Sequence, residues 1–337
     1  MGHRYELPIV SFAAAILVLL PLPWHWKARN VATLSLIGWL FICNIIRGIN
    51  SIIWMNNVAI HFHVWCDIAT KLLIGVSIAL PACSLTLTRH LEHVASVRYG
   101  LTTAAEKRRR RIIDLCFTIG IPLVMMALHY VVQGHRFDIV EDIGCQPVIY
   151  TSLSGVLLMF GTPLLLSVCS LVYAGLALRH FAIRRLQFEQ HLRDSKSAMT
   201  TARYMRLMAL ALTEMVWGVS LGTFVVFENI TQSGLRPWVS FADVHYNFSR
   251  VAVFPNFLVP NMAEVLLIWW ITPSTAILFF VFFGFSDEAR EGYKSIWRWI
   301  CRKVFRRDFS QSEKITSLPQ YRCVRPLMPP GPTLTSR

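Results

Sequence analysis

The chain has 337 residues, of which 54% are hydrophobic and 15% are charged, and its formal net charge is +14. Water-soluble domains carry about 25% charged residues, so this composition argues against a soluble protein and for an integral membrane protein. Most of the 33 Lys and Arg residues lie in segments that are predicted below to face one side of a membrane. The positive charge therefore indicates membrane topology and contact with acidic lipid, and not a nucleic-acid groove.

Seven apolar segments are long enough to cross a bilayer as helices, which takes about 20 residues each. They cover approximately residues 7–23, 31–54, 66–88, 112–132, 150–178, 204–228 and 257–284. Pro122 and Pro273 lie within the fourth and seventh segments and predict local bends there. The pattern predicts an all-α membrane protein built as a bundle of seven transmembrane helices.

The third segment, Cys66–Thr88, gives the predicted bundle its direction. An almost uncharged stretch precedes it, and Arg89, Arg98 and the basic run Lys107–Arg111 follow it. Because Lys and Arg are retained on the cytoplasmic side, we place Cys66 outside the cell and Arg89 inside. Alternation then puts the N-terminus outside and the C-terminus inside. The inner connections are 24–30, 89–111 and 179–203, and the outer ones are 55–65, 133–149 and 229–256.

A further helix is predicted after the seventh span. Tyr293, Ile296, Trp297 and Ile300 recur at helical spacing, and basic residues occupy the opposite face, as in a helix that lies on a membrane surface. We therefore divide the chain into a transmembrane domain (1–285), a membrane-surface helix (286–307) and a disordered cytoplasmic tail (308–337). Cys301, on the apolar face of the surface helix, is a candidate for palmitoylation.

Four stretches carry a resemblance to a known family: LPLPWHWKARN (20–30), VWCD (64–67), VVQGHRFDIVEDIGCQP (131–147) and VSFADVHYNFSRV (239–251). In this order they resemble the fungal mating-pheromone receptors of the a-factor-receptor-like branch (class D) of G-protein-coupled receptors, particularly mushroom lipopeptide pheromone receptors. The resemblance covers about residues 5–285. It implies a farnesylated peptide ligand outside, a heterotrimeric G protein inside, a plasma-membrane location, and neither enzymatic activity nor a cofactor.

Two cysteines fall on the predicted outer side, where oxidation is allowed. Cys66 begins the third span and Cys145 lies in the loop after the fourth. A disulfide between them would hold that loop over the mouth of the bundle; the alternative is two free thiols. Asn229 and Asn247 begin sequons for N-glycosylation, and both also fall on the outer side.

Three charged residues near the outer ends of the spans are candidates for ligand binding. Asp67 and Lys71 are four residues apart, so they are expected to pair on one helix face. Arg47 lies inside the second span and must face the bundle, where Asp67 or Glu264 could pair with it. The alternative interpretations are a local ion pair and a structural interhelical bond.

The outer loops supply further candidates for contact with the peptide part of a ligand. These are Arg136, Asp138, Glu141, Asp142, Trp238, Asp243 and His245. For any one of them, a solvated rim position is the alternative. The VSFADVH segment is favoured because the family resemblance includes it.

Glu214, in the inner half of the sixth span, and Pro273 in the seventh span are candidate switch residues; for Glu214 the alternative is a satisfied hydrogen bond to a neighbouring helix. A group of basic residues borders the predicted inner opening and could contact an acidic helix of a G-protein α-subunit. Its members are Arg89, Arg184, Arg185, Arg203 and Arg206. Retention of positive charge inside the cell explains most of these residues equally well.

Other functions fit the sequence less well. Transporters and channels often contain internal repeats with paired broken helices, and no repeat relates the two halves of this chain. A retinal photoreceptor needs a lysine in the last span, and 257–284 contains none. No spacing typical of a metal site or a nucleophile–base pair is found, which argues against a membrane enzyme. The pattern leaves homo-oligomerisation open.

Overall fold

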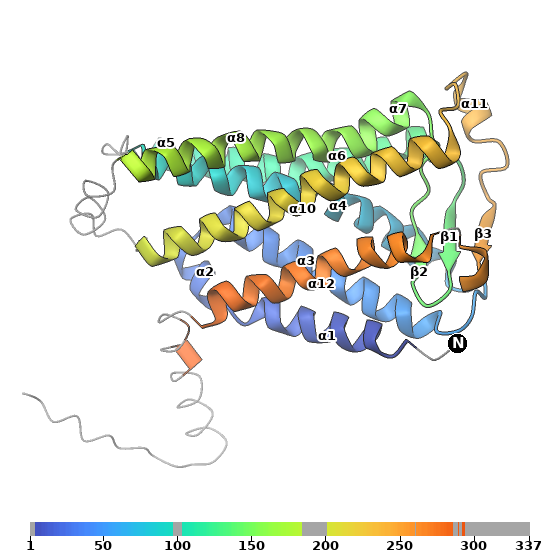
Figure 1. Ribbon diagram of the computed structural model, residues 1–337, viewed down its shortest axis with the longest axis horizontal. Coiled ribbons are helices and arrows are strands. Elements are labelled where there is room, and N and C mark those ends of the chain that lie inside the picture. Colours follow the sequence, from blue (N-terminus) through green and yellow to red (C-terminus); the bar gives the residue numbers. More distant parts are fainter. Residues whose placement is uncertain are drawn as a thin grey trace, which may run out of the picture. The chain divides into compact units, whose positions relative to one another are not determined.

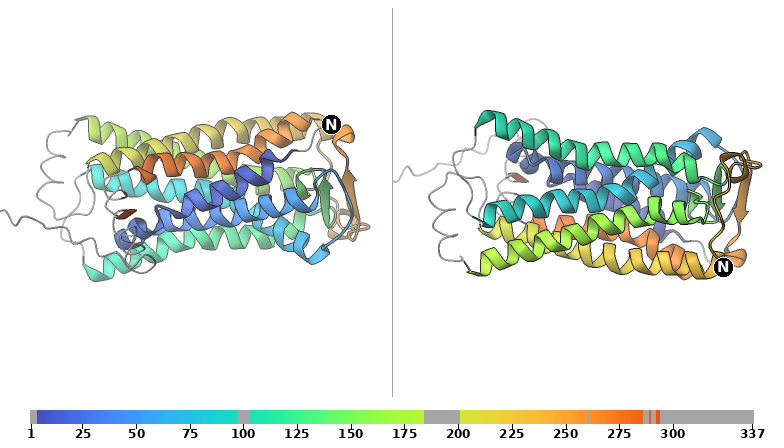
Figure 2. Two further views of the ribbon diagram at one scale, coloured as in Figure 1. Left: turned by 90° about the horizontal axis from the view of Figure 1, so that it is seen from below. Right: turned by 90° about the horizontal axis from the view of Figure 1, so that it is seen from above.

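The computed structural model describes residues 4–96, 103–183, 201–259 and 261–285, together with 289, 292 and 293. The chain divides into one large unit, Met1–Gly292, and a second unit, Tyr293–Arg337, in which Tyr293 alone is described. The predicted surface helix and tail therefore lie outside the described residues, apart from isolated positions. Within the large unit, helices run side by side along one direction (Figures 1 and 2).

Seven helical segments among the described residues are long and apolar enough to cross a membrane. They confirm the predicted number of spans and are Glu6–Ala28, Val31–Ile53, His63–Ala95, Ala104–Val132, Leu153–Ile183, Tyr204–Glu228 and Met262–Gly284. The elements that build them are α1 (Glu6–Leu19), α2 (Leu22–Ala28), α3 (Val31–Ile53), α4 (His63–Ala95), α5 (Ala104–Leu115), η1 (Cys116–Gly120), α6 (Ile121–Leu128), η2 (His129–Val132), α7 (Leu153–Gly155), η3 (Val156–Gly161), α8 (Thr162–Ile183), α10 (Thr201–Ser233) and α12 (Met262–Gly284).

Helix α4 is the most deeply buried of these seven spans. It packs against α3, α6, α8 and α10, and the main hydrophobic cluster of the bundle includes its residues Val76, Ala79, Cys83, Leu87 and Leu91. The segment that gave the sequence its predicted direction therefore lies at the centre of the fold.

Proline explains two local departures from α-helical geometry. The π-helical turns η1 and η3 end just before Pro122 and Pro163. Proline has no backbone N–H, and local π adjustments are one way in which membrane helices satisfy the carbonyls that it leaves free. The irregularity predicted at Pro122 is thus present as a π turn.

Several predicted connections are helical instead. The segment 24–30 lies mostly in α2, and Asn30 caps α3 by accepting a hydrogen bond from Thr33 N at 3.3 Å. The segment 89–111 is not one continuous loop, because α4 runs to Ala95 and α5 begins at Ala104. A capping box between Thr103 and Glu106 starts α5, so the basic run Lys107–Arg111 is helical.

The prediction of an all-α protein was wrong in one respect, because a three-stranded sheet lies at one end of the bundle, the end that also holds the first described residues (Figures 1 and 2). Its strands are β1 (Phe137–Val140), β2 (Gly144–Gln146) and β3 (Val251–Phe254), in the order β2-β1-β3. β1 pairs antiparallel with β2 and parallel with β3. We call β1, β2 and β3 together the sheet lid. The end of the bundle that carries them is called the sheet end, and the opposite end is called the far end. Two short helices, α11 (Phe241–Val244) and η4 (Asn256–Leu258), flank β3.

Candidate functional site

The sheet lid is fixed to the bundle by a disulfide between Cys66 at the start of α4 and Cys145 in the middle of β2. Both cysteines are fully buried, in a cluster with Trp54, Phe137 and Ile139. The β1–β2 turn has little room, because Gly144 has φ +86° and a Cβ there would lie 2.6 Å from Asn50 Cβ. The loop between the fourth and fifth spans is therefore held on α3 and α4.

The expected Asp67–Lys71 ion pair is not formed, because each side chain has a better-placed partner from another part of the chain. The Asp67 carboxylate accepts two hydrogen bonds from Arg136, at 2.9 and 2.6 Å. This two-point contact raises the pKa of the Arg136 guanidinium above its ordinary value. Lys71 instead donates to His129 Nδ1 at 2.8 Å and to Gln133 Oε1 at 2.7 Å. The other ring nitrogen of His129 donates to the Val148 carbonyl at 2.9 Å, so this cluster joins α4 to the chain that leaves the lid.

The expected partners of Arg47 were also wrong. Arg47 donates through Nη1 to the backbone carbonyls of Ile268, at 3.3 Å, and Trp269 in α12. Asp67 is occupied by Arg136, and backbone carbonyls of the seventh span take the place that Glu264 was expected to fill.

Two of the loop acids hold the lid together. Glu141 Oε2 accepts from Asn256 N at 2.8 Å, and Asp142 accepts from Asn56 N at 3.0 Å and from Asn256 Nδ2 at 2.8 Å. Their carboxylates therefore connect the β1–β2 turn to the segments before α4 and after β3. Asp138 differs, because it pairs with His135 at 2.6 Å and also lines the cavity described next.

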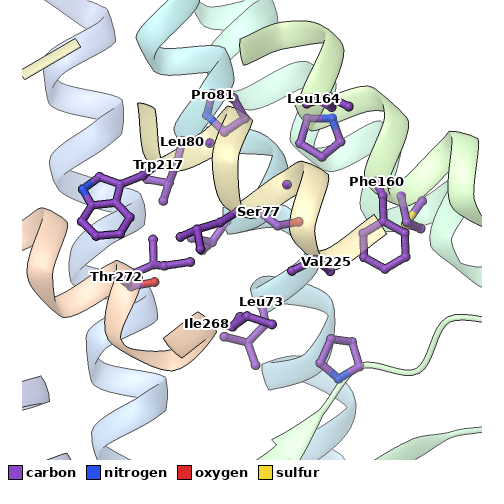
Figure 3. Close-up of a pocket in the computed structure, with 18 of the residues that line it drawn as sticks. Leu73, Ser77, Leu80, Pro81, Phe160, Leu164, Trp217, Val225, Ile268 and Thr272 are labelled. Carbon is purple, nitrogen blue, oxygen red and sulfur yellow. The ribbon is translucent and has the colours of Figure 1, made fainter. Parts of the chain in front are cut away.

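A cavity of about 570 Å³ lies within the bundle beneath the sheet lid. α3, α4, η3, α8, α10 and α12 form its walls, and Asp138, Gln146 and residues 147–149 lie at the lid side. Figure 3 shows the side chains of Leu73, Leu80, Phe160, Val225 and Ile268 gathered around it. The lining is mostly apolar, with few polar groups, as in sites that bind lipid-like or aromatic molecules.

The remaining predicted ligand residues lie around the lid and not among the residues that line this cavity. His245 binds the backbone carbonyls of Phe241, at 2.8 Å, and Tyr130, at 2.9 Å. Trp238 and Asp243 are exposed, and Glu264 is half-buried in the first turn of α12.

The far end of the bundle carries one ion pair and two polar contacts that sequence reasoning did not predict. Arg89 donates to Asp114 Oδ1 at 2.8 Å, which joins α4 to α5. Arg110 donates to His93 Nε2 at 2.5 Å, and His180 Nε2 lies 3.7 Å from Glu92 Oε1. Of the predicted G-protein contacts, Arg89 is thus paired within the bundle and Arg206 is half-buried.

Comparison with known proteins decides the family. The sequence profile of the pheromone A receptor family matches residues 6–304, which is most of the chain. The chain belongs to the pheromone A receptor family. This family consists of multi-pass receptors of the plasma membrane, and not of enzymes.

Individual members of the pheromone A receptor family are similar over most of this chain. The pheromone B beta 1 receptor of Schizophyllum commune is 48% identical over 293 residues, which are 86% of this chain and 54% of the relative. Pheromone receptor 1 of Ustilago hordei is 35% identical over 85% of this chain and 81% of its own length. The pheromone a factor receptor of Saccharomyces cerevisiae is 22% identical over 89% of this chain and 63% of its own. The chain spans about half the length of the Schizophyllum receptors that it matches.

The other predicted positions of this family member fall partly inside and partly outside the described residues. Arg184, Arg185 and Cys301 lie outside the described residues, as do the side chains of Arg203, Glu214 and Asn229. Asn247 is exposed on the loop before β3, and Pro273 is buried within α12.

Sequence reasoning missed the apolar lining of the cavity. The sequence does not distinguish lining residues such as Leu73, Val76, Phe160, Leu221 and Ile271 from the other apolar residues of the spans. Hydropathy gives no signal that separates a residue facing a cavity from one facing lipid, because the same side chains suit both surroundings.

Proposed function

We propose that the chain is a G-protein-coupled receptor for a farnesylated peptide pheromone. The observation that carries the proposal is the apolar cavity beneath the sheet lid. Its volume of about 570 Å³ lies within the range of small-molecule pockets. An isoprenoid chain placed there would gain about 0.8 kcal/mol for each CH₂ removed from water.

The peptide part of this ligand would contact the lid and its surroundings. Asp138 and Gln146 are the polar groups that the lid presents to the cavity. Trp238, Asp243 and His245 would form an outer rim, and Glu264 and Arg47 would contribute from the bundle. The hydrogen bonds described above give Asp67, Lys71, Arg136, Glu141 and Asp142 a positioning role, since they hold the lid in place.

In this proposal the sheet end faces the outside of the cell and the far end faces the cytoplasm. The basic residues Arg89, Arg184, Arg185, Arg203 and Arg206 would lie near a heterotrimeric G protein. Glu214 and Pro273 would be switch residues. The proposal also includes a membrane-surface helix at 286–307 and a disordered tail at 308–337. It further includes palmitoylation of Cys301, glycosylation of Asn229 and Asn247, and homo-oligomerisation.

A reporter cell tests the function directly. The receptor is expressed in a cell whose pheromone pathway drives a reporter gene, and the cell is treated with a panel of synthetic peptides in farnesylated and unfarnesylated forms. We expect a response to at least one farnesylated peptide and a loss of potency of at least tenfold without the farnesyl group. Uptake of a solute without a reporter response would contradict the receptor function and support a transporter.

Substitutions that narrow the cavity test whether it binds the tail of the ligand. Leu73→Trp and Ile268→Trp add bulk to the lining and should reduce potency, because the tail and the new ring would occupy the same space. Leu165→Trp is the matched control, since Leu165 is 64% exposed on the outside of the bundle. Equal potency of all three variants at equal surface expression would place the ligand elsewhere.

A further inference from the structure

Pro273 creates a gap in the hydrogen bonding of α12. Proline has no backbone N–H, so the carbonyl four residues before it, that of Trp269, has no helical donor. Arg47 fills this gap from α3: its Nη1 donates to the carbonyl of Trp269 and, at 3.3 Å, to that of Ile268. A side chain of the second span thus completes the backbone of the seventh.

The guanidinium of Arg47 has donors that these two bonds do not use. Arginine carries five N–H donors, and the hydrogen bonds to α12 come from Nη1 alone. Nε is buried and has no hydrogen-bond partner within the part of the chain that the structure describes. None of the ion pairs found there includes Arg47. A half-buried cation whose donors are incompletely used is unfavourable in a membrane interior, and marks a candidate site for a ligand.

Arg47 also lines the cavity, together with Ile268 and Thr272 of α12. Among the described lining residues, Arg47 and Asp138 alone are charged. Asp138 belongs to the lid and is paired with His135, whereas Arg47 belongs to the wall. A ligand that fills the apolar space therefore meets one cationic group with an unused donor.

We propose that Arg47 is a bridging residue, which holds the α12 carbonyls through Nη1 and binds a carbonyl or carboxylate oxygen of the ligand through guanidinium N–H groups that these two bonds leave unused. This inference rests on the proposed function, because it assumes that the tail of the ligand occupies the cavity. In this arrangement, the side chain of Arg47 alone connects the ligand oxygen to the Trp269 carbonyl that Pro273 leaves without a helical donor. A change in the position of Arg47 on ligand binding would therefore change the hydrogen bonding of α12.

The test measures binding of three probes to the purified full-length chain in lipid nanodiscs. The probes are N-acetyl-S-farnesylcysteine, its methyl ester, and farnesyl ethyl thioether, which has the same tail and no oxygen. Both the wild type and Pro273→Ala contain Arg47. In each of these two proteins, we expect at least one of the two oxygen-bearing probes to bind more tightly than the thioether. Better binding of the acid alone identifies a carboxylate as the partner, and better binding of both identifies a carbonyl.

Arg47→Gln should weaken binding of the oxygen-bearing probes by about tenfold and leave binding of the thioether unchanged, because the thioether has no oxygen for Arg47 to bind. Because Arg47→Gln alone leaves the Trp269 carbonyl without its donor and could fail to fold, the deciding variant is Arg47→Gln/Pro273→Ala. In that variant, the alanine that replaces Pro273 supplies a backbone N–H to the Trp269 carbonyl. Arg179→Gln, an exposed charge loss on α8, is the control and should match the wild type.

Two results would overturn the inference, and they can be told apart. If the folded double variant distinguishes the probes as the wild type does, Arg47 does not bind the ligand oxygen, while the apolar cavity remains a valid site for the tail. If the wild type binds none of the farnesyl probes, the proposed ligand class is wrong, and the role of Arg47 is wrong with it.

Discussion

Gly144 lets the β1–β2 turn pack closely against Asn50 and Trp54. Its φ of +86° lies in a region that L-residues rarely adopt, and the space beside it is filled by Asn50 and Trp54. Asp142 in the same turn also has a positive φ, of 65°, but its carboxylate is held by hydrogen bonds to Asn56 and Asn256. The turn therefore tolerates a side chain at one position and not at the other.

Gly144→Ala should lower the free energy of unfolding by about 3 kcal/mol, because the new Cβ adds both backbone strain and a clash with α3. Thermal unfolding of the purified receptor measures this change. Gly175→Ala is the control: no atom lies within 4 Å of the added Cβ, and alanine favours a helix more than glycine does. A Gly144→Ala receptor as stable as the Gly175→Ala receptor would show that the turn can move away from α3.

The partners of Asp67 and Lys71 could not be predicted from the sequence. The spacing of Asp67 and Lys71 favours a pair, yet Arg136, 69 residues further along the chain, binds Asp67 at two points. The advantage of a local i, i+4 pair is only about 0.2–0.5 kcal/mol, which tertiary partners readily exceed. Spacing therefore identified both charged residues as important but could not identify their partners.

At the scale of elements, the disulfide links one strand to one helix. Cys145 lies in the middle of β2 and Cys66 at the buried start of α4, with Cα atoms 5.4 Å apart. The two cysteines are 79 residues apart in sequence, so the bond constrains a long loop of the unfolded chain.

Cys66→Ser and Cys145→Ser should each reduce stability by about 2–4 kcal/mol, and the double variant should lose about as much as either single one, since each change breaks the same bond. Thermal unfolding and ligand response on intact cells measure the effect. Cys116→Ser, which changes an exposed free cysteine, should match the wild type. Additive losses in the double variant would mean that the thiols act separately.

Helices α8 and α10 approach closely at Gly218, where an added Cβ would lie 2.7 Å from Ser167 Oγ. Gly222, one turn later, has more room, with its nearest neighbour, Leu164 Cδ1, at 3.8 Å. Small residues at such spacing let membrane helices come close together. Both glycines line the cavity, so this contact also sets its width.

Gly218→Ala should lower the melting temperature and the potency of the ligand, because the methyl group pushes α10 away from α8. Adding Ser167→Ala removes the clashing hydroxyl and should restore most of both properties. Gly222→Ala provides the matched control and should have little effect. If Ser167→Ala does not improve the Gly218→Ala receptor, the defect does not come from the contact between Gly218 and Ser167.

For the whole molecule, composition and hydropathy predicted the seven spans because length and apolarity are properties of each segment alone. The sheet lid could not be predicted in this way. Its strands have three or four residues, and β1 pairs in parallel with β3, which begins more than a hundred residues later. The cavity was missed for a related reason, since its lining comes from six helical elements and two strands that meet only in the fold.

The proposed orientation makes a prediction about the whole chain. A tag at the N-terminus should be accessible to antibody in intact cells, and a tag after Arg337 should become accessible only after permeabilisation. Replacing the basic run Arg108–Arg111 with glutamine should reduce the proportion of correctly oriented receptor. Both tags accessible on the same face would contradict an odd number of crossings.

The parallel pairing of β1 with β3 has a mechanical consequence. β3 belongs to the connection between the sixth and seventh spans, and β1 is anchored to the third through β2 and its disulfide. At the sheet end, the sixth and seventh spans are therefore tied to the third by the main-chain hydrogen bonds of this pair and by the hydrogen bonds of Asn256 to Glu141 and Asp142. Breaking these bonds would free two helices at once from their link to the third span.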